Sequence, residues 1–282
     1  DKDSGLYEYT DPKLIMPPWP DSFKGYAGWP EIYIAGIPLS ISRYPNEGFI
    51  QADSIIRAGK KPENKETKQE PPKFLSAQLT HNYNKELPLF LNGYWTFKWA
   101  DEIIRVDSIN PQSGEIELAA PHNYGMGAPS GGLFYAINQP EYVDTENEYY
   151  YNPKTGTLRF IHSFSDEEVE SIQIAYQDFT LLEIRDCNQI KIENIDFKYH
   201  NNLAVSISNS KSVVIDQAEM YGLGRSAVAI TEGFNCGVRN SRLKYLGDAG
   251  ILLSGGDKNT LTKATHFVED CSISYFSRHV KT

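Results

Sequence analysis

The stretch that decides the fold is LEIRDCNQIKIENIDF, which runs from Leu182 to Phe197. Its apolar residues alternate with polar ones, a pattern typical of a half-buried strand. The same spacing returns 23 residues later in different letters. Three columns of apolar positions keep this step: Ile184, Ile207, Ile230 and Leu253; Ile192, Ile215 and Val238; Phe197, Met220 and Leu243.

A polar column keeps the same interval through Asn194, Gln217 and Asn240. After Leu253 the register slips by seven, where the chain inserts GGDKNTLTKA. Three positions then resume the columns 30 residues beyond their predecessors, and they are Val268, Asp270 and Ile273. Weaker apolar positions fit one coil before the repeat, at Val169, Ile172 and Ile174.

The fixed interval predicts a repeat architecture, because solenoids and propellers have periods of about 20 to 50 residues. Each unit here has two or three short alternating strands and no helix pattern. A leucine-rich repeat would need its consensus leucines, and a propeller blade is nearly twice as long. We therefore expect an all-β protein in which residues 171–282 form a right-handed parallel β-helix of about 23 residues per coil. Its coils should stack about 4.8 Å apart.

Residues 1–170 predict an antiparallel, β-rich module of the sandwich or barrel type. Three segments alternate about turn residues and indicate hairpins: EIYIAGIPLSIS (31–42), EIIRVDSINPQSGEIELA (102–119) and EYYYNPKTGTLRFIH (148–162). The charged, proline-rich segment GKKPENKETKQEPP (59–72) predicts a solvated, mobile loop.

The net charge, the apolar runs and the positions of cysteine and histidine argue against several functions. A formal net charge of −10 over 282 residues argues against a nucleic-acid partner. No apolar run approaches the roughly 20 residues of a membrane span. The cysteines Cys187, Cys236 and Cys271 have neither C-x-x-C nor zinc spacing and are expected to be buried thiols. The six histidines are scattered, so we predict no metal and no cofactor.

The repeat also places outward side chains in rows, because residues one coil apart become neighbours. The expected rows are Asp196, Glu219 and Arg242; Glu193 and Asp216; Tyr199, Gly222, Tyr245 and Tyr275, an aromatic strip interrupted by one glycine; and Asp186, Asn209 and Glu232 at a turn.

The distance between coils sets the distance between carboxylates in one row, and this distance matters for chemistry that needs two carboxylates. Asp196 and Glu219, on adjacent coils about 4.8 Å apart, approach the ~5–5.5 Å of retaining glycosidases. Asp186 and Glu232, two coils or about 9.6 Å apart, lie at the wide limit of the ~6.5–9.5 Å inverting range. The alternative is that these acids keep an exposed face soluble and that Arg242 neutralises its row.

The most distinctive stretch is LGDAGILLSGGDKNTL (246–261), with Asp248 before a strand and Asp257 in the glycine-rich loop after it. Insertions in solenoids tend to line one binding face. The alternative is a structural turn in which Asp caps backbone amides. The candidate catalytic residues are Asp257, Asp248 and Glu232; the candidate substrate-binding residues are Arg225, Tyr245, Arg278 and His279.

Four segments resemble bacterial β-helix proteins classed with glycoside hydrolases, most closely family 141, with an architecture shared by family 120 xylosidases. They are IYIAGIPLSISRYPNEGF (32–49), GYWTFKWADEIIRVDSI (93–109), GGLFYAINQPEYVDTENEYYYNPKTGTLRF (131–160) and GDAGILLSGGDKNTLT (247–262). The resemblance implies a secreted or periplasmic enzyme acting on plant or algal polysaccharide. It also implies that residues 1–170 form a β-rich module inserted near the start of the β-helix.

The chain departs from this family in two ways. Family members begin with further coils and continue past SRHVKT (277–282), so we expect this chain to be truncated at both ends. The family's acidic D-A-G motif lies beyond Thr282, whereas Asp248 sits at least one coil too early. The family's catalytic acids are therefore not assigned to residues of this chain.

The resulting hypothesis is a carbohydrate-active enzyme that cleaves glycosidic bonds of a polysaccharide or oligosaccharide with two carboxylates. One carboxylic acid would protonate the leaving oxygen, and the other would act as nucleophile or base. Two alternatives remain: a polysaccharide lyase, which needs a base and a cation such as Arg278 near the uronate, and a non-catalytic β-helix that binds glycans or partners. The sequence leaves the sugar, the linkage, the stereochemical outcome and the oligomeric state open.

Overall fold

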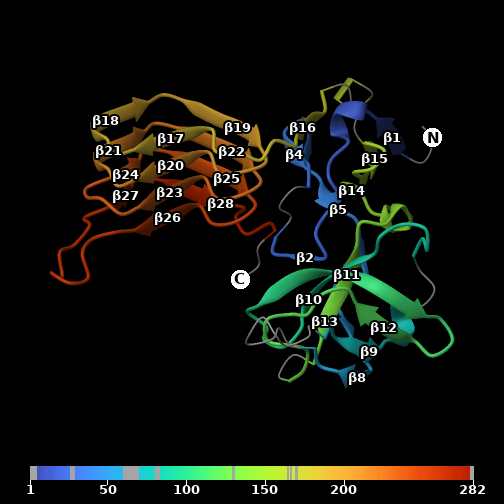
Figure 1. Cartoon of the computed structure of the whole chain (residues 1–282). Helices are drawn as coiled ribbons and strands as arrows, with labels where there is room; N and C mark the ends of the chain where they lie inside the picture. The colour runs from blue at the N-terminus through green and yellow to red at the C-terminus, as the bar shows by residue number, and fades with distance from the viewer. Residues whose placement is uncertain are drawn as a thin grey trace. The chain divides into compact units, whose positions relative to one another are not determined.

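The computed structural model of the chain is built from β-strands (Figure 1). It describes residues 5–25, 29–59, 70–79, 83–128, 131–163, 165, 167–168 and 171–279. Internal contacts divide the chain into two compact units. The first, here the N-terminal module, comprises Asp1–Gly25, Leu39–Ser165 and Thr282; the second, here the solenoid unit, comprises Tyr26–Pro38 and Asp166–Lys281.

The N-terminal module consists mainly of antiparallel strands. Its elements are β1 (Leu6–Thr10), η1 (Pro12–Leu14), β2 (Ser22–Phe23), β5 (Ser40–Ile41), β6 (Arg43–Tyr44), β7 (Ile50–Gln51), β8 (Ser54–Arg57), β9 (Lys73–Leu75), η2 (Ala77–Leu79), β10 (Phe90–Tyr94), β11 (Asp101–Asn110), β12 (Glu115–Leu118), β13 (Leu133–Ile137), η3 (Pro140–Tyr142), β14 (Glu148–Asn152) and β15 (Thr157–Ile161). One sheet has the order β1-β15-β14-β5, and a larger one the order β6-β13-β10-β11-β12-β9-β8, with β2 on β11 and β7 on β13. The expected antiparallel sheets are confirmed, and β14–β5 is a parallel exception.

The three predicted hairpins form. The strands β11 and β12 pair about the turn at 110–114, and β14 and β15 about the turn at 152–156. In the first hairpin Ile34 pairs with Ile37, so Ala35 and Gly36 form the turn with φ of 49° and 79°. Both values are left-handed, a requirement of tight hairpin turns. Most of the predicted mobile loop, residues 60–69, lies outside the described residues.

The solenoid unit stacks its strands into three four-stranded parallel sheets (Figure 1). These are β17 (Leu182–Arg185), β20 (Val205–Ser208), β23 (Val228–Thr231) and β26 (Ile251–Ser254); β18 (Asn188–Glu193), β21 (Lys211–Asp216), β24 (Gly237–Arg239) and β27 (Phe267–Glu269); and β19 (Asp196–His200), β22 (Glu219–Leu223), β25 (Arg242–Leu246) and β28 (Ser272–Ser274). The register follows the sequence period: Ile184 pairs with Ile207, and Ile207 with Ile230. The parallel β-helix of about 23 residues per coil is confirmed.

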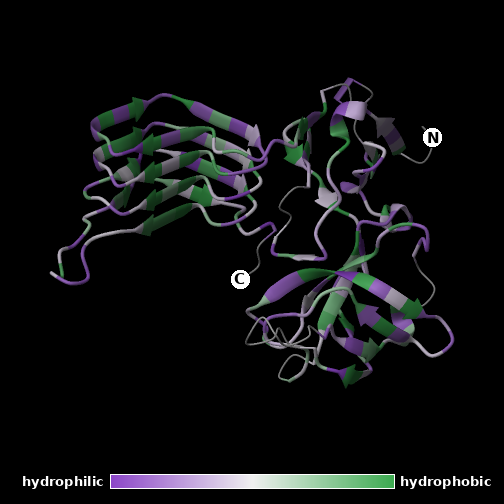
Figure 2. Ribbon diagram, viewed as in Figure 1, coloured by the Kyte–Doolittle hydropathy of each residue, from purple (hydrophilic) through white to green (hydrophobic). Residues whose placement is uncertain are grey.

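The solenoid core lies between these three sheets, and the apolar columns fill it. Ile207, Ile215 and Val238 have no exposed surface. The columns continue into the last coil, where Leu253 is 40% and Val268 42% exposed. The column residues of the last coil, which is covered by a neighbouring coil on one side, are therefore less buried than those of the inner coils. Figure 2 shows the hydrophobic residues concentrated along the stacked strands.

Each coil bends at repeated left-handed residues. The residues with positive φ include Asp186, Asn209 and Glu232 at one corner; Asn194, Gln217, Asn240 and Asp270 at the next; and Tyr199, Gly222, Tyr245 and Tyr275 at the third. Asn, Asp and Gly adopt this conformation at least cost, which accounts for the Asn and Asp residues of the first two columns. The polar ladder predicted from the sequence thus lies at a corner.

One predicted coil does not form. Ile172 and Ile174 were expected one coil before the repeat, and Val169, the third position, lies outside the described residues. Instead β16 (Gln173–Ala175) pairs antiparallel with β3 (Glu31–Ile34), which continues into β4 (Ile37–Pro38). A strand from far earlier in the chain thus takes the place of a coil. The repeat period cannot reveal such a partner.

Candidate functional site

The candidate site is the outward side of the sheet β19-β22-β25-β28, here called the outer face. Alternate residues of a strand point to opposite sides of a sheet, so residues paired between strands form rows. The two rows of the outer face are Asp196, Glu219 and Arg242, and Lys198, Tyr221 and Lys244. The first row is the one that the sequence predicts.

Two carboxylates lie side by side on this face. Asp196 and Glu219 are register partners on adjacent strands, and their side chains are 55% and 44% exposed. Lys198 bridges them: its Nζ is 3.1 Å from Oδ2 of Asp196 and contacts Oε2 of Glu219. Hydrogen bonds to Glu219 and then Asp196 raise the pKa of Lys198. Exposed ion pairs of this kind add little stability, so the fold does not depend on them.

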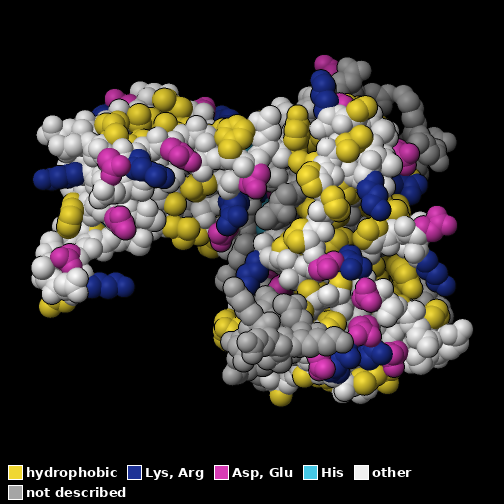
Figure 3. All heavy atoms as spheres, viewed as in Figure 1, with side chains coloured by type: hydrophobic (Ala, Val, Ile, Leu, Met, Phe, Trp, Pro, Cys, Tyr) yellow, Lys and Arg dark blue, Asp and Glu magenta, His cyan; other side chains and the backbone are white. Residues whose placement is uncertain are grey.

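A shallow groove of about 410 Å³ borders the first row. Its lining residues are Asp196, Gln217, Ala218, Glu219, Asn240 and Arg242. Carboxylates accept hydrogen bonds, a guanidinium donates them and amides do both. The groove therefore offers donors and acceptors in the mixture that a polyhydroxylated ligand needs. Figure 3 shows acidic and basic side chains interspersed on the surface of the solenoid unit.

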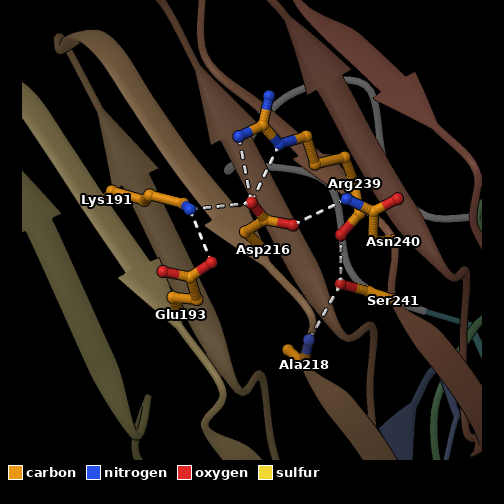
Figure 4. Close-up of polar contacts among 7 residues, drawn as sticks. All are labelled: Lys191, Glu193, Asp216, Ala218, Arg239, Asn240 and Ser241. Carbon is orange, nitrogen blue, oxygen red and sulfur yellow. Dashed lines mark hydrogen bonds and ion pairs between the residues drawn. The ribbon is translucent and has the colours of Figure 1, made fainter.

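A buried charge fixes the corner beside this groove (Figure 4). The Asp216 side chain is 4% exposed and accepts hydrogen bonds from Asn240 Nδ2 at 2.9 Å and Arg239 Nε at 3.0 Å. Lys191 Nζ lies 3.1 Å away. The hydrogen bond from Asn240, then those from Lys191 and Arg239, lower the pKa of Asp216 to about 2. Its partner in the predicted row, Glu193, stays exposed, whereas Asp216 turns out to be buried.

A continuous ladder of tyrosines runs along the edge of the outer face. The sequence predicts a strip interrupted at Gly222, but the Tyr221 ring fills that gap. It lies 5.9 Å from the Tyr199 ring and 5.3 Å from the Tyr245 ring, and Tyr245 lies 4.9 Å from Tyr275. Gly222 keeps its predicted place in the column, and the ring of Tyr221, one residue earlier, continues the ring contacts past it. Gly222 is needed for another reason, because a Cβ there would lie 2.8 Å from the Tyr33 ring.

The structure separates two of the predicted catalytic acids. Asp248 precedes β26 and Asp257 follows it. The four extended residues of β26, about 13 Å of strand, therefore lie between them. Asp257 accepts hydrogen bonds from Asn259 N at 2.8 Å and Thr260 Oγ1 at 2.9 Å, and these lower its pKa. This is the turn-capping arrangement that the sequence left as an alternative.

The third predicted acid, Glu232, is exposed at the corner that follows β23. Asn209 stands between Glu232 and Asp186 in the column and donates a hydrogen bond to Asp186 Oδ1 at 2.6 Å. The Asp248 carboxylate accepts one from Ser226 Oγ at 3.4 Å. The structure does not gather Asp248, Asp257 and Glu232 at one point, and their catalytic roles stay predictions.

The predicted substrate-binding residues fall into two groups. Tyr245 belongs to the tyrosine ladder, and Arg225 is exposed one coil before Asp248. Arg278 and His279 are instead engaged inside the solenoid unit with Glu31, whose side chain is 4% exposed. Arg278 Nη1 lies 2.9 Å from Glu31 Oε2, and His279 Nε2 contacts Oε1. These two side chains serve an internal ion cluster in this structure.

The N-terminal module contains a separate pocket of about 490 Å³ that the sequence did not reveal. Trp19, Phe90, Tyr150 and Arg105 are among its lining residues. Arg105 Nε pairs with Asp21 Oδ1 at 2.7 Å, so its charge is compensated within the pocket. Five parts of the chain contribute to its walls, and no local motif marks such a convergence.

The described residues contain no group of three or more His, Cys, Asp or Glu side chains placed to hold a metal ion. None of the described helices has the length and hydropathy of a membrane span. The three cysteines are free thiols: Cys236 is buried, and Cys187 and Cys271 are partly exposed.

Comparison with known proteins supports the class of fold. Residues 163–278 match the family model described as "Right handed beta helix region". A solved structure described as "Glycoside hydrolase" aligns with a TM-score of 0.66 and 10% sequence identity, over 88% of this chain and 54% of that one. The chain thus spans about half the length of the matched structure. No curated protein matches the sequence. The protein is a β-helix protein whose fold resembles that of a glycoside hydrolase.

Proposed function

We propose that this protein is a carbohydrate-active enzyme, or a substantial part of one, that hydrolyses glycosidic bonds of plant or algal polysaccharide. Support comes from the fold likeness to a glycoside hydrolase and from the sequence resemblance to families 141 and 120. Because such polymers lie outside the cell, we also propose a secreted or periplasmic location. The glycan would lie across the outer face.

The observation that carries this proposal is the carboxylate pair Asp196 and Glu219. Register partners in a parallel sheet lie about 4.8 Å apart, close to the ~5–5.5 Å of retaining enzymes. One carboxyl would protonate the glycosidic oxygen as the other attacks the anomeric carbon. Water would then release the sugar from the second carboxylate, with the first acting as base. The groove beside the pair supplies hydrogen-bond partners for sugar hydroxyls.

The same geometry favours a second candidate function, a non-catalytic glycan-binding surface. General acid catalysis needs one protonated carboxyl, whereas Lys198 bridges both carboxylates as an ion cluster. An unaltered cluster of this kind binds hydroxyls without cleaving the polymer. Hydrolysis would require the substrate to displace Lys198 from one of its two partners.

Turnover assays on matched variants separate the two functions. The full chain would be incubated with a panel of plant and algal polysaccharides, and released reducing ends would be measured. Binding to the same polymers would be followed by affinity electrophoresis. The variants are Asp196→Asn, Glu219→Gln and Asp257→Asn, with the exposed solenoid carboxylate variant Glu193→Gln as control.

If Asp196 and Glu219 act as the pair, turnover falls at least ~100-fold in each of their variants and is retained in Asp257→Asn and Glu193→Gln. Loss of turnover in Asp257→Asn alone would indicate that the catalytic site lies in the inserted loop. Binding without turnover would establish the non-catalytic surface, and an unsaturated product in place of a hydrolysed one would establish a lyase. A chain that neither binds nor cleaves any polymer refutes the proposal.

A further inference from the structure

Two cations on the outer face have no carboxylate partner. Arg242 and Lys244 point the same way from β25, two residues or about 6.6 Å apart along the strand. Among the residues that the structure describes, neither is in an ion pair, because Lys198 occupies the neighbouring Glu219. On the following strand the two rows continue with the small residues Ser272 and Ser274. The register partners of the two cations on that side are therefore small and uncharged.

Aromatic rings position one of these cations. Lys244 Nζ lies 4.6 Å from the Tyr245 ring centre and 5.3 Å from the Tyr275 ring centre, within cation–π range. Tyr275 is 63% exposed, so the ladder presents a ring beside the charge. Arg242 lines the groove together with the amides Gln217 and Asn240. Positive charge, an exposed aromatic ring and the neutral amides of the groove thus lie next to one another.

The local charge is opposite to that of the whole chain. The formal net charge of the chain is −10, yet the two rows of the outer face combine three cations with two carboxylates. A concentration of uncompensated positive charge in an acidic protein favours an anionic ligand at that place. Exposed tyrosine favours a ligand with a flat apolar surface, and the amides favour one with hydroxyls.

We infer that Arg242 and Lys244, flanked by Tyr245 and Tyr275, form a subsite for an acidic glycan that carries carboxylate or sulfate groups. This inference rests on the proposed function and narrows its substrate class. The two cations pair with anionic groups along the polymer, and the tyrosines contact the sugar rings between them. The ligand is bound without any covalent step at this subsite.

Pairs of polymers that differ only in charge test the inference. Polygalacturonate is compared with its methyl ester, and dextran sulfate with dextran, by calorimetry or affinity electrophoresis at low and high salt. The first pair isolates the carboxylate and the second the sulfate. We expect tighter binding of at least one charged member than of its neutral counterpart, and weaker binding as salt screens the contact.

Charge-neutralising variants locate the contact. Arg242→Gln and Lys244→Gln should each weaken binding of the charged polymer roughly fivefold at low salt, as expected for one solvent-exposed charge pair. Lys211→Gln is the matched control, because Lys211 is an exposed cation on a different sheet of the same solenoid. Circular dichroism confirms that each variant is folded.

Three results overturn the inference. They are equal binding of charged and neutral polymers, an effect of Lys211→Gln as large as that of the outer-face variants, and tight binding of neutral polymers alone. The last outcome leaves the proposed function intact and removes only the acidic substrate class. Failure of every polymer, charged or neutral, removes both.

Discussion

Replacing Glu31 with Gln should destabilise the solenoid unit substantially. Glu31 lies in β3 and accepts hydrogen bonds from Tyr33 and Arg278, each at 2.9 Å, and it contacts His279. Burial alone would raise the pKa of Glu31, but the charges of Arg278 and His279 outweigh it and hold that pKa well below its usual value. The carboxylate is therefore the counterion of a buried cluster that joins the β3–β4 hairpin to the last coil.

The size of the effect follows from what the substitution leaves behind. The Gln side chain has nearly the same shape, but Arg278, whose side chain is 16% exposed, loses its charged partner. Removing one member of a buried ion pair costs about 3–5 kcal/mol, because the remaining charge stays desolvated. Since Arg278 retains some contact with water, we expect a loss near the lower limit, about 3 kcal/mol.

Urea unfolding at pH 7, followed by circular dichroism and by hydrogen exchange of the β3 amides, measures this loss. The control is Glu183→Gln, an exposed carboxylate of β17 whose replacement should change stability by less than about 0.5 kcal/mol. The double variant Glu31→Leu, Arg278→Met should recover part of the loss, because it removes the buried Arg278 charge together with its partner, while the Tyr33 hydroxyl and His279 still lose their acceptor. A Glu31→Gln variant as stable as Glu183→Gln would refute the reasoning.

Three further predictions concern stability. Because the folded pKa of Asp216, about 2, lies below its ordinary value of 3.8, its contribution is present above pH 3.8 and is lost as the pH falls toward 2; urea unfolding of Asp216→Asn between pH 5 and 2 should show a flatter pH dependence than the wild type. Burial raises the pKa of Glu148 from 4.5 to about 7, although backbone N–H groups of Asp144 and Thr145 oppose it. Its contribution to the free energy of unfolding is therefore present below pH 4.5 and lost as the pH rises through 7. In the wild type this free energy should fall by about 3 kcal/mol between pH 4.5 and 8, and Glu148→Gln should abolish the fall; urea unfolding followed by tryptophan fluorescence measures it. Ile207→Ala should cost about 3–4 kcal/mol in thermal unfolding and Leu253→Ala distinctly less, because Ile207 is fully buried whereas Leu253 is 40% exposed; equal losses would contradict the stacked-column account.

The sequence was sufficient to predict the solenoid because its information is local and periodic. An apolar column needs only a constant interval, and the pairing of Ile184 with Ile207 follows that interval directly. The sheet β16-β3-β4 was not predictable in the same way. Glu31 meets Arg278 across 247 residues, and nothing near either residue marks the other as its partner.

The candidate site was predictable in part for the same reason. The row Asp196, Glu219 and Arg242 follows from the period alone. The column of Tyr199, Gly222 and Tyr245 also follows from the period. The period does not show that the ring of Tyr221, from the neighbouring row, contacts the rings of Tyr199 and Tyr245 beside Gly222. Lys198 as the bridge between two carboxylates depends on its rotamer, which no spacing specifies.

The architecture also limits which acids can work together. Residues in one column are held about 4.8 Å apart by the hydrogen bonds between coils, whereas residues at opposite ends of a strand are held apart by its length. Asp248 and Asp257 are separated in this way by β26. A partner for Asp257 would have to come from its own corner, where Glu232 lies in the column of Gly255, two residues before Asp257. Two-carboxylate chemistry on this solenoid therefore leaves three pairs: Asp196 and Glu219 on adjacent coils, Asp186 and Glu232 two coils apart, and Asp257 and Glu232 near one corner. Because the first pair lies on the outer face and the other two share Glu232, substitutions of Glu219 and of Glu232, assayed on one polymer, distinguish the outer face from the corner.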